Sequence, residues 1–600
     1  MHPIQRLPPR IVPRPLCEPV RQRARELGYT PLQARVIAGR LDERHLDRLE
    51  ALLRPSLANL DNPSTLPDIA IAANAIADAI VEGRTIVANV DFDCDGTCSF
   101  ALFFLILTEQ FGVPPERVVK LIAHRRKDGY GLSQTIADTI IDRYPVDALI
   151  VTADQGSSDH DRIARLAEAG YRVVVTDHHA VPASGPPPAA IACVNPCRAD
   201  SVFPDRSICG AAVAWLTLCA VRAELIRRGH LPTTAPRLQA YLDFAAAATI
   251  ADCADLAGSV NNRAFVTAGL ALMNRPDARP CWLAMRQLLK IEGPVTAQDL
   301  AFGLMPRLNS ASRMEHASLG IDWLLASSVE DALRSAEVLD ASNRERQLTE
   351  RALKEQLLGH ALDVAEQGSA SVVAFAPDGH QGVMGIVAAR LVEATGRPSA
   401  VFVSKQSDPT VATGSFRSIP GLDVRACIAE VAANDPEIFT GHGFGGHAAA
   451  AGAHLAIDQL PNFMIQFEAA VRSRVDVDRL APQVLVDERA PLEQGPLLMA
   501  ELAVLEPFGR VFDAPSFSLE ATVEAITPMG DGTHLRLRLQ AGDRQLDAVW
   551  FRAVGDRSAT WPIEPGQSAT FVVEPGLNTF RGRTTLQWRI KTLTTAIEWA

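Results

Sequence analysis

The stretch VANVDFDCDGTCSFALFF, residues 87–104, joins two apolar runs through three acidic residues. An apolar run up to Val90 is followed by Asp91, Asp93 and Asp95, and a second apolar run with helical spacing begins after Gly96. The pattern predicts a buried strand that ends at the acidic residues and is followed at once by a helix. Side chains two residues apart in an extended chain point to the same side, so the three carboxylates are expected to converge. Converged carboxylates repel one another unless a cation neutralises them.

Three short β-branched runs, separated by helical segments, predict a parallel sheet with helices on both faces. They are RTIVANV (84–90), DALIVTAD (147–154) and RVVVTDHH (172–179). In such sheets, ligands bind beyond the carboxyl ends of the strands. The second run ends on Asp154, the third ends on Asp177, His178 and His179, and Asp252 follows later in ATIADCADL.

A single Asp-Gly pair would indicate only a turn with a capping aspartate. Acidic residues at the ends of three strands, one of them beside two histidines, favour a metal site instead. Carboxylate oxygens with an imidazole suit Mn²⁺ or Mg²⁺ better than a structural zinc. The number of carboxylates favours two ions, an arrangement typical of enzymes that hydrolyse phosphate esters.

The rest of the chain predicts an α/β fold class with several domains. A helical region with a charged run at 328–367 predicts a long connecting helix, and a second α/β unit follows it. From about residue 485 the period-two pattern of short strands predicts a small β-barrel. The expected segments are a cap at 1–60, an α/β domain at 61–290, a helical connector at 291–365, a second α/β domain at 366–480 and the barrel at 481–600.

The composition of the chain limits the classes of protein and the cellular compartments that fit it. The 600 residues carry a formal net charge of −12, which argues against a surface coated in basic charge but leaves room for a local basic groove. The ten cysteines are scattered, which favours reduced thiols in a cytosol, with structural zinc as the lesser alternative. The start of the chain has no apolar signal segment, and the most apolar run is too short for a bilayer. We expect a cytoplasmic protein without membrane association.

The motifs, taken in order, resemble the DHH phosphoesterase superfamily, named for the Asp-His-His at 177–179. Further matching segments extend the resemblance over most of the chain, to the RecJ-type single-stranded-DNA-specific exonucleases. They are RRKDGYGL (125–132), TIADCADLAGSVNNR (249–263), PRLNSASR (306–313), ASNRERQ (341–347), GHQGVMGIVAARL (379–391), GSFRSIPGLD (414–423) and GHGFGGHAAAAG (441–452).

The resemblance implies a DHH domain, a long helix, a DHH-associated domain and a C-terminal OB-fold. It also implies degradation of single-stranded DNA from 5′ to 3′ into mononucleotides with two Mn²⁺ or Mg²⁺ ions, in DNA repair and recombination. Single-stranded DNA is the implied partner of a monomeric enzyme, and a single-strand-binding protein or a helicase are candidate protein partners.

The resemblance also carries over site residues. The metal ligands would be Asp91, Asp93, Asp95, Asp154, His178 and Asp252. The catalytic group would be Asp154, bridging both ions, with His178, Asp177 and His179, the last of these contacting the scissile phosphate or assisting proton transfer. Which of Asp91 and Asp177 binds an ion directly and which orients a ligand stays open. The substrate-binding residues would be Arg125, Tyr130, Asn309, Arg313, Ser415, Arg417, Gly446 and His447.

Two regions add expectations about DNA. The segment GHGFGGH (441–447) is interpreted as a Gly-rich loop leading into a helix, whose amide groups could hold a phosphate. In the barrel, Arg536 and Arg538 alternate along one strand, and a basic stripe lies near Phe580 and Trp588, which suits stacking plus charge; an ordinary half-exposed strand pair is the alternative. The stripe comprises Arg581, Arg583, Arg589 and Lys591. All proposed metal ligands precede residue 260. A chain that ends near Asp478 is therefore expected to keep its catalytic chemistry and to bind long DNA strands more weakly.

The chain departs from the family pattern at four places: at Cys94, at Ser312, in CADL (253–256), which lacks a Pro, and in PFGRVFDAPSF (507–517), which lacks a Gly-Asn-Pro. None removes a predicted ligand. Two rival functions remain at this point. One is a DHH phosphodiesterase acting on short oligonucleotides, cyclic dinucleotides or pyrophosphate; the other is a non-catalytic nucleic-acid-binding scaffold, which degenerate acidic motifs would mark.

Overall fold

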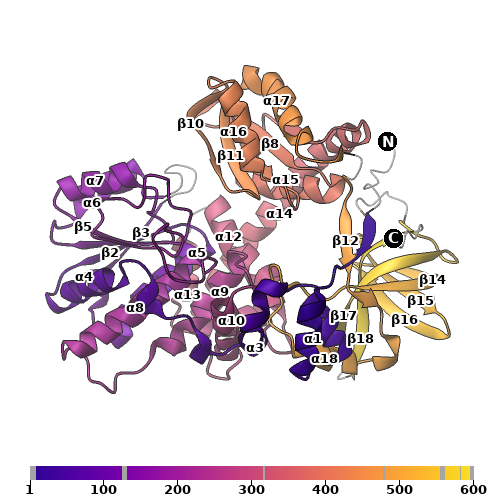
Figure 1. The fold of residues 1–600 in the computed structure, drawn as a ribbon, viewed down its shortest axis with the longest axis horizontal. Helices are drawn as coiled ribbons and strands as arrows, with labels where there is room; N and C mark the ends of the chain where they lie inside the picture. Colours follow the sequence, from indigo (N-terminus) through magenta and orange to yellow (C-terminus); the bar gives the residue numbers. More distant parts are fainter. Residues whose placement is uncertain are drawn as a thin grey trace. The chain divides into compact units, whose positions relative to one another are not determined.

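The computed structural model describes residues 9–123, 131–314, 318–477, 480–530, 532–554, 561–580 and 583–594 (Figure 1). The chain divides into two compact units. The first unit comprises Cys17–Glu345 together with Leu505–Asp513, and the second comprises Met1–Leu16, Arg346–Val504 and Ala514–Ala600.

The first unit contains the predicted parallel sheet. Its strands are β2 (Ile86–Val90), β3 (Val118–Ile122), β4 (Leu149–Ala153), β5 (Arg172–Thr176) and β6 (Ala192–Val194), in the order β3-β2-β4-β5-β6. All neighbouring strands run parallel, and every residue of β2 and β4 is buried, as continuous apolar runs in parallel strands require. The last residues of β2, β4 and β5, namely Val90, Ala153 and Thr176, stand side by side in register.

Helices cover both faces of this sheet. In Figure 1, α6 (Gln134–Arg143) and α7 (His160–Glu168) lie on one side, and α4 (Ile69–Val81) and α8 (Gly210–Arg227) lie on the other. The remaining helices of four or more residues in the first unit are α1 (Glu18–Glu26), α2 (Pro31–Ala38), η1 (Glu43–Arg48), α3 (Leu49–Leu53), α5 (Cys94–Leu105), η4 (Ile106–Gln110), η6 (Leu238–Tyr241), α9 (Leu242–Ala251), α10 (Val260–Met273), α11 (Pro280–Leu289), η7 (Asp299–Leu304), α12 (Met305–Met314) and α13 (Ser318–Leu324). The predicted connecting helix is α14 (Val329–Glu366).

The second unit begins its sheet with the predicted strand at 370–377. The strands are β7 (Val372–Phe375), β8 (Ser399–Lys405), β9 (Asp408–Arg417), β10 (Phe439–Gly446) and β11 (Ala450–Ala456), in the order β10-β11-β9-β8-β7. The helices are α15 (Met384–Thr395), α16 (Val424–Asn434) and α17 (Leu460–Arg472). Four buried phenylalanine rings meet in its core: Phe402, Phe416, Phe463 and Phe467.

The predicted helix after GHGFGG is wrong. The segment forms an antiparallel hairpin of β10 and β11, with the turn closed by the His447 N–H, which donates to the Ala450 carbonyl at 2.7 Å. Its alanines have high helix propensity, but Ala450–Ala456 pairs along its whole length with β9 and buries every second residue. Sheet pairing and burial therefore override the local preference.

The C-terminal barrel is present as predicted. Its strands are β14 (Phe517–Met529), β15 (His534–Ala541), β16 (Arg544–Trp550), β17 (Ser568–Phe580) and β18 (Arg583–Thr594), and pairing of β14 with β17 closes it. The second unit also contains the helix α18 (Leu497–Ala503) and three short strands, β1 (Arg10–Pro13), β12 (Gln483–Val486) and β13 (Glu488–Arg489). Strand β1 pairs with β12, and β13 pairs with β14 of the barrel. Arg536 and Arg538 are exposed, but Trp588 is buried against Phe517, so the expectation that it stacks on DNA bases is wrong.

Within the described ranges, no helix taken singly is long and apolar enough to cross a membrane. The pair Leu57–Thr65 and Ile69–Val81 meets the length and composition criteria only when the two are joined, across a bend of 87°.

Candidate metal centre

The carboxyl edge of the first unit's sheet brings the predicted acidic residues together. Asp91, Asp154 and Asp177 directly follow the three register partners that end β2, β4 and β5. The chain leaves β2 toward β3 on one side and later returns to β4 on the other, so this edge is a topological switch point.

The acidic loop is held by its own backbone and by α12. The carboxylate of Asp93 caps α5 by accepting the N–H groups of Asp95 and Gly96, at 2.9 and 3.3 Å. The side-chain oxygen of Asn309 accepts the Cys94 N–H at 2.9 Å. A Cβ atom at Gly96 would overlap the carbonyl group of Asp91, so the spacing D-x-D-x-D-G requires the glycine.

The first turn of α8 holds the carboxylate of Asp95 in its orientation. Its two carboxylate oxygens accept the backbone N–H groups of Gly210 and Ala211, both at 2.7 Å. These donors lie at a helix N-terminus, where the partial positive charge favours a carboxylate. A Cβ atom at Gly210 would lie 2.7 Å from both Cβ and Oδ1 of Asp154, so this glycine lets the helix approach. Gly210 was not among the residues expected from the sequence, although a glycine that opens an apolar helical run is a signal of close helix packing.

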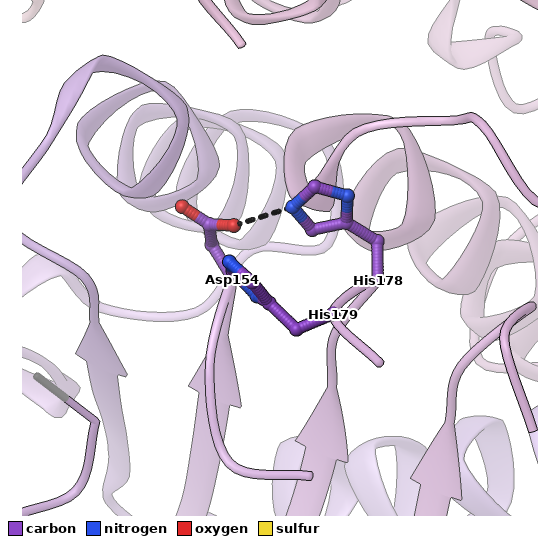
Figure 2. A group of neighbouring side chains, drawn as sticks. All are labelled: Asp154, His178 and His179. Atoms are coloured by element: carbon purple, nitrogen blue, oxygen red, sulfur yellow. Dashed lines mark ion pairs between the residues drawn. The ribbon is translucent and has the colours of Figure 1, made fainter. Parts of the chain in front are cut away.

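Asp154 and His178 form the middle of the site (Figure 2). Asp154 has a left-handed backbone, with φ of 62°, and its Oδ1 lies 3.1 Å from Nε2 of His178. Both atoms are buried, and neither makes a hydrogen bond with the described residues. The same Nε2 lies 3.7 Å from Asp95, and Nδ1 of His178 lies 3.9 Å from Asp252. Two buried, unsatisfied ligand atoms facing each other fit a metal ion.

The carboxylate of Asp177 is hydrogen-bonded by neighbouring groups of the chain. Its Oδ1 accepts the N–H groups of His178 and His179 and faces Nδ1 of His179 at 2.8 Å, while its Oδ2 accepts the Ser157 N–H. Burial alone would raise the pKa of Asp177, but the bond to the His179 ring and the charges of both histidines hold it well below its usual range. Burial opposes charge on His179 as well, yet the bond to Asp177 raises the pKa of His179 to about 9.

The crowded carboxylates resist ionisation. Burial, followed by repulsion from Asp95 and Asp93, raises the pKa of Asp154 well above its usual value. Partial burial and the same two neighbours raise the pKa of Asp252 to about 8. A divalent cation would favour the charged forms of both groups.

Three clusters have ligand atoms close enough to hold an ion, each within 4.8 Å of one another. They are Asp154 with His178 and His179, Asp95 with His178 and Asp252, and Asp91 with Asp93 and Asp154. Asp154 and His178 each belong to two clusters, which suits two ions that share ligands. All six predicted ligands therefore fall into one site, whose donors match Mn²⁺ or Mg²⁺.

The predicted substrate residues lie in three places. Arg125 and Tyr130 lie outside the described residues. Asn309 and Arg313 lie on α12, where Asn309 supports the acidic loop as described. Ser415, Arg417, Gly446 and His447 lie in the second unit.

Arg417 and Ser415 lie against the start of α15. Nη1 of Arg417 donates to Ser415 Oγ at 3.3 Å, and a Cβ atom at Gly385 would lie 2.7 Å from Nη2 of Arg417. A guanidinium and a hydroxyl beside the first turn of a helix form an arrangement that suits a phosphate. Gly385 was not singled out from the sequence, although it lies inside a matched motif.

Family models match the chain in three places. They are the DHH family, N-terminal domain, over residues 85–249, the DHHA1 domain over 368–473 and the RecJ OB domain over 489–592.

Whole proteins and structures match as well. The single-stranded-DNA-specific exonuclease RecJ of Haemophilus influenzae is 32% identical, covering 91% of this chain and 93% of that protein. The enzyme of the same name from Escherichia coli is 31% identical over 86% of this chain and 88% of its own. A crystal structure of RecJ in complex with Mn²⁺ from Thermus thermophilus has a TM-score of 0.74 at 26% identity, covering 99% of this chain and 80% of that one.

Gly210→Ala should disable the site without unfolding the protein. The added methyl group would push α8 away from Asp154 and move the amides that aim Asp95, so Mg²⁺ affinity should fall by about 10- to 100-fold. Calorimetric Mg²⁺ titration is the measurement. Gly359→Ala on α14 is the matched control, because nothing lies near its Cβ position and alanine stabilises a helix by about 0.5–1 kcal/mol. Unchanged Mg²⁺ affinity in Gly210→Ala would show that α8 accommodates the added methyl group without moving the amides that bind Asp95.

Metal should stabilise the protein more at high pH than at low pH. The folded pKa of Asp252 is raised from 3.8 to about 8, so the folded, metal-free protein retains protons that the unfolded chain has lost. Its stability therefore falls as the pH rises through this window, and a bound cation restores it. We expect the rise in melting temperature on adding Mg²⁺ to be larger at pH 8 than at pH 6, and Asp252→Asn to shrink the difference. A shift that is equal at both pH values would contradict this account.

Proposed function

The chain belongs to the family of single-stranded-DNA-specific RecJ exonucleases, and on that premise we propose that it hydrolyses single-stranded DNA from the 5′ end to mononucleotides with two Mn²⁺ or Mg²⁺ ions. The observation that carries the proposal is the buried pair of Asp154 and His178, with four further carboxylates around it and unsatisfied ligand atoms facing each other. When bound, the ions supply an activated water and stabilise the developing charge on the phosphate oxygens.

The protein's own residues are proposed to bind the ions, to orient the histidines and to contact the scissile phosphate. The ligand set is proposed to be Asp91, Asp93, Asp95, Asp154, His178 and Asp252. Asp177 orients both histidines, because its oxygens are used by their backbone amides and by the His179 ring. The side chain of His179 is held by Asp177 and is 46% exposed, so it is placed to donate a hydrogen bond to the scissile phosphate.

The other regions are proposed to bind and guide the strand. Arg417 and Ser415, beside the first turn of α15, are candidates for phosphate contacts, with Gly446 and His447 at the neighbouring hairpin. The exposed Arg536 and Arg538 suit phosphate contacts on the barrel. The proposed domains are a cap at 1–60, the DHH domain at 61–290, the connector at 291–365, the DHH-associated domain at 366–480 and the OB domain at 481–600. We further propose a cytoplasmic monomer that works with a single-strand-binding protein or a helicase in DNA repair and recombination.

Labelled strands test the reaction directly. A long single strand carrying a 5′ label should release labelled mononucleotide at once with Mn²⁺ or Mg²⁺, while a 3′ label should remain on shortening fragments. Chelation should stop both, and restored metal should restart them. Release of the 3′ label first would reverse the proposed direction. Cleavage confined to dinucleotides or cyclic dinucleotides would favour the small-substrate alternative, and binding without cleavage would favour a scaffold.

Asp154→Asn should lower turnover by about 100-fold or more, because the neutral amide removes the carboxylate that belongs to two ligand clusters. Steady-state cleavage of a labelled strand is the measurement, with circular dichroism to confirm folding. Asp161→Asn is the control, since this carboxylate lies in the same unit but is exposed at the start of α7. Near-normal turnover in Asp154→Asn would remove Asp154 from the proposed metal centre.

A further inference from the structure

The segment Leu505–Asp513 lies between α18 and β14 in the sequence but belongs to the first unit. We refer to Leu505–Asp513 as the strap. It carries the altered FGRVFD sequence, and it lies far in sequence from the helices and loops of the first unit that it contacts. Its ring pair, Phe508 and Phe512, is stacked, and Phe512 is buried.

Arg263, near the start of α10, is the main anchor of the strap. Its side chain is almost fully buried and donates to the carbonyls of Leu505 at 2.9 Å and Pro507 at 3.3 Å. It also donates to the Leu52 carbonyl at 2.6 Å and the Leu256 carbonyl at 3.2 Å. Its guanidinium lies 4.5 Å from the centre of the Phe512 ring. A buried arginine is tolerated only when such partners satisfy it, so the strap completes the arginine's surroundings.

The far end of the strap is fixed by a second buried arginine and by a backbone bond. Nε of Arg40 donates to the Asp513 carbonyl at 2.6 Å. The Leu256 N–H donates to the Arg510 carbonyl at 3.1 Å. A Cβ atom at Gly509 would lie 2.6 Å from the side chain of Leu256, so the strap lies directly on this residue.

The proposed ligand Asp252 begins the loop that joins α9 to α10, and Leu256 lies within this loop. The loop leaves α9 at Asp252, and Cys253 adopts a left-handed backbone with φ of 53°. At its other end Asn262 donates to the carbonyl of Asp255 at 3.0 Å. The loop is therefore held by α9 at one end and by the strap, Arg263 and Asn262 at the other.

We propose that the strap is a positioning element for Asp252: it fixes Leu256 from the outer side and so sets where the Asp252 carboxylate meets the metal. The inference rests on the proposed role of Asp252 as a ligand. It predicts, against the expectation that a chain ending near Asp478 keeps its chemistry, that this truncation weakens the metal site, because it removes the strap and the carbonyl groups of Leu505 and Pro507 that Arg263 binds.

Phe512→Ala in the full chain tests the proposal. The loss of the ring beneath Arg263 should loosen the strap and weaken Mn²⁺ binding by about 10-fold, measured by electron paramagnetic resonance on protein checked for folding. We expect kcat at low Mn²⁺ to fall while the KM for DNA stays constant, and high Mn²⁺ to restore kcat. Val81→Ala is the control, because this exposed valine ends α4 in the same unit but lies outside the strap. Arg263→Lys, which keeps a cation but loses the fork of donors, should behave like Phe512→Ala.

The outcomes separate the strap from the metal centre. Wild-type Mn²⁺ affinity in folded Phe512→Ala and Arg263→Lys would overturn the proposal, as would a kcat loss that high Mn²⁺ leaves uncorrected. Asp252→Asn is measured in parallel. If Asp252→Asn binds Mn²⁺ as the wild type does, the assignment of Asp252 as a ligand fails; if only Asp252→Asn weakens binding, that assignment holds and the strap proposal alone is wrong.

Discussion

Mutual repulsion among carboxylates at one sheet edge is the constraint on which the rest of the first unit depends. Asp91, Asp154 and Asp177 are brought side by side by strand register, and the folded chain must hold them there before any cation arrives. It does so with backbone amides, which donate without adding a competing side-chain charge. The first turn of α8 aims Asp95, and Asp93 caps the helix that begins beside it. The glycines follow from the same need, because Gly96 and Gly210 allow backbone to approach the acids closely.

Asp177 is not among the proposed metal ligands, and the chain itself supplies the counter-charge for its carboxylate. Asp177 is paired with His179 and with three backbone amides, so it stays ionised. Asp154, one strand away, has burial and like charges around it and resists ionisation. Two aspartates at equivalent strand ends thus acquire opposite electrostatic characters from their neighbours, and this difference supports the proposal that Asp177 orients the histidines while Asp154 binds metal.

The parts of the site that could be predicted are those encoded in contiguous sequence. Strand ends followed by acids gave Asp91, Asp154 and the pair of histidines, because register in a parallel sheet turns separate strand ends into neighbours. The barrel was readable from its period-two strands. The amides of Gly210 and Ala211 could not be read as carboxylate donors, since backbone groups leave no trace in composition. The helix expected after GHGFGG failed because alanine propensity is local, whereas the pairing of β11 with β9 depends on a partner strand more than thirty residues earlier. The role of Arg263 was hidden for the same reason, as its partners in the strap lie more than 240 residues away.

The long sequence separation between Arg263 and the strap has a consequence for biosynthesis. A chain emerges from the ribosome at roughly 5–20 residues per second, and its domains generally fold in the order in which they appear. The sheet and all six proposed ligands emerge early, yet the last carbonyl partners of Arg263 are made only when residue 507 and its neighbours have left the exit tunnel. The first unit therefore cannot reach its final packing as an early product of translation. A nascent chain that stalls before the strap would carry the whole acidic edge, but its Arg263 would lack the carbonyl groups of Leu505 and Pro507.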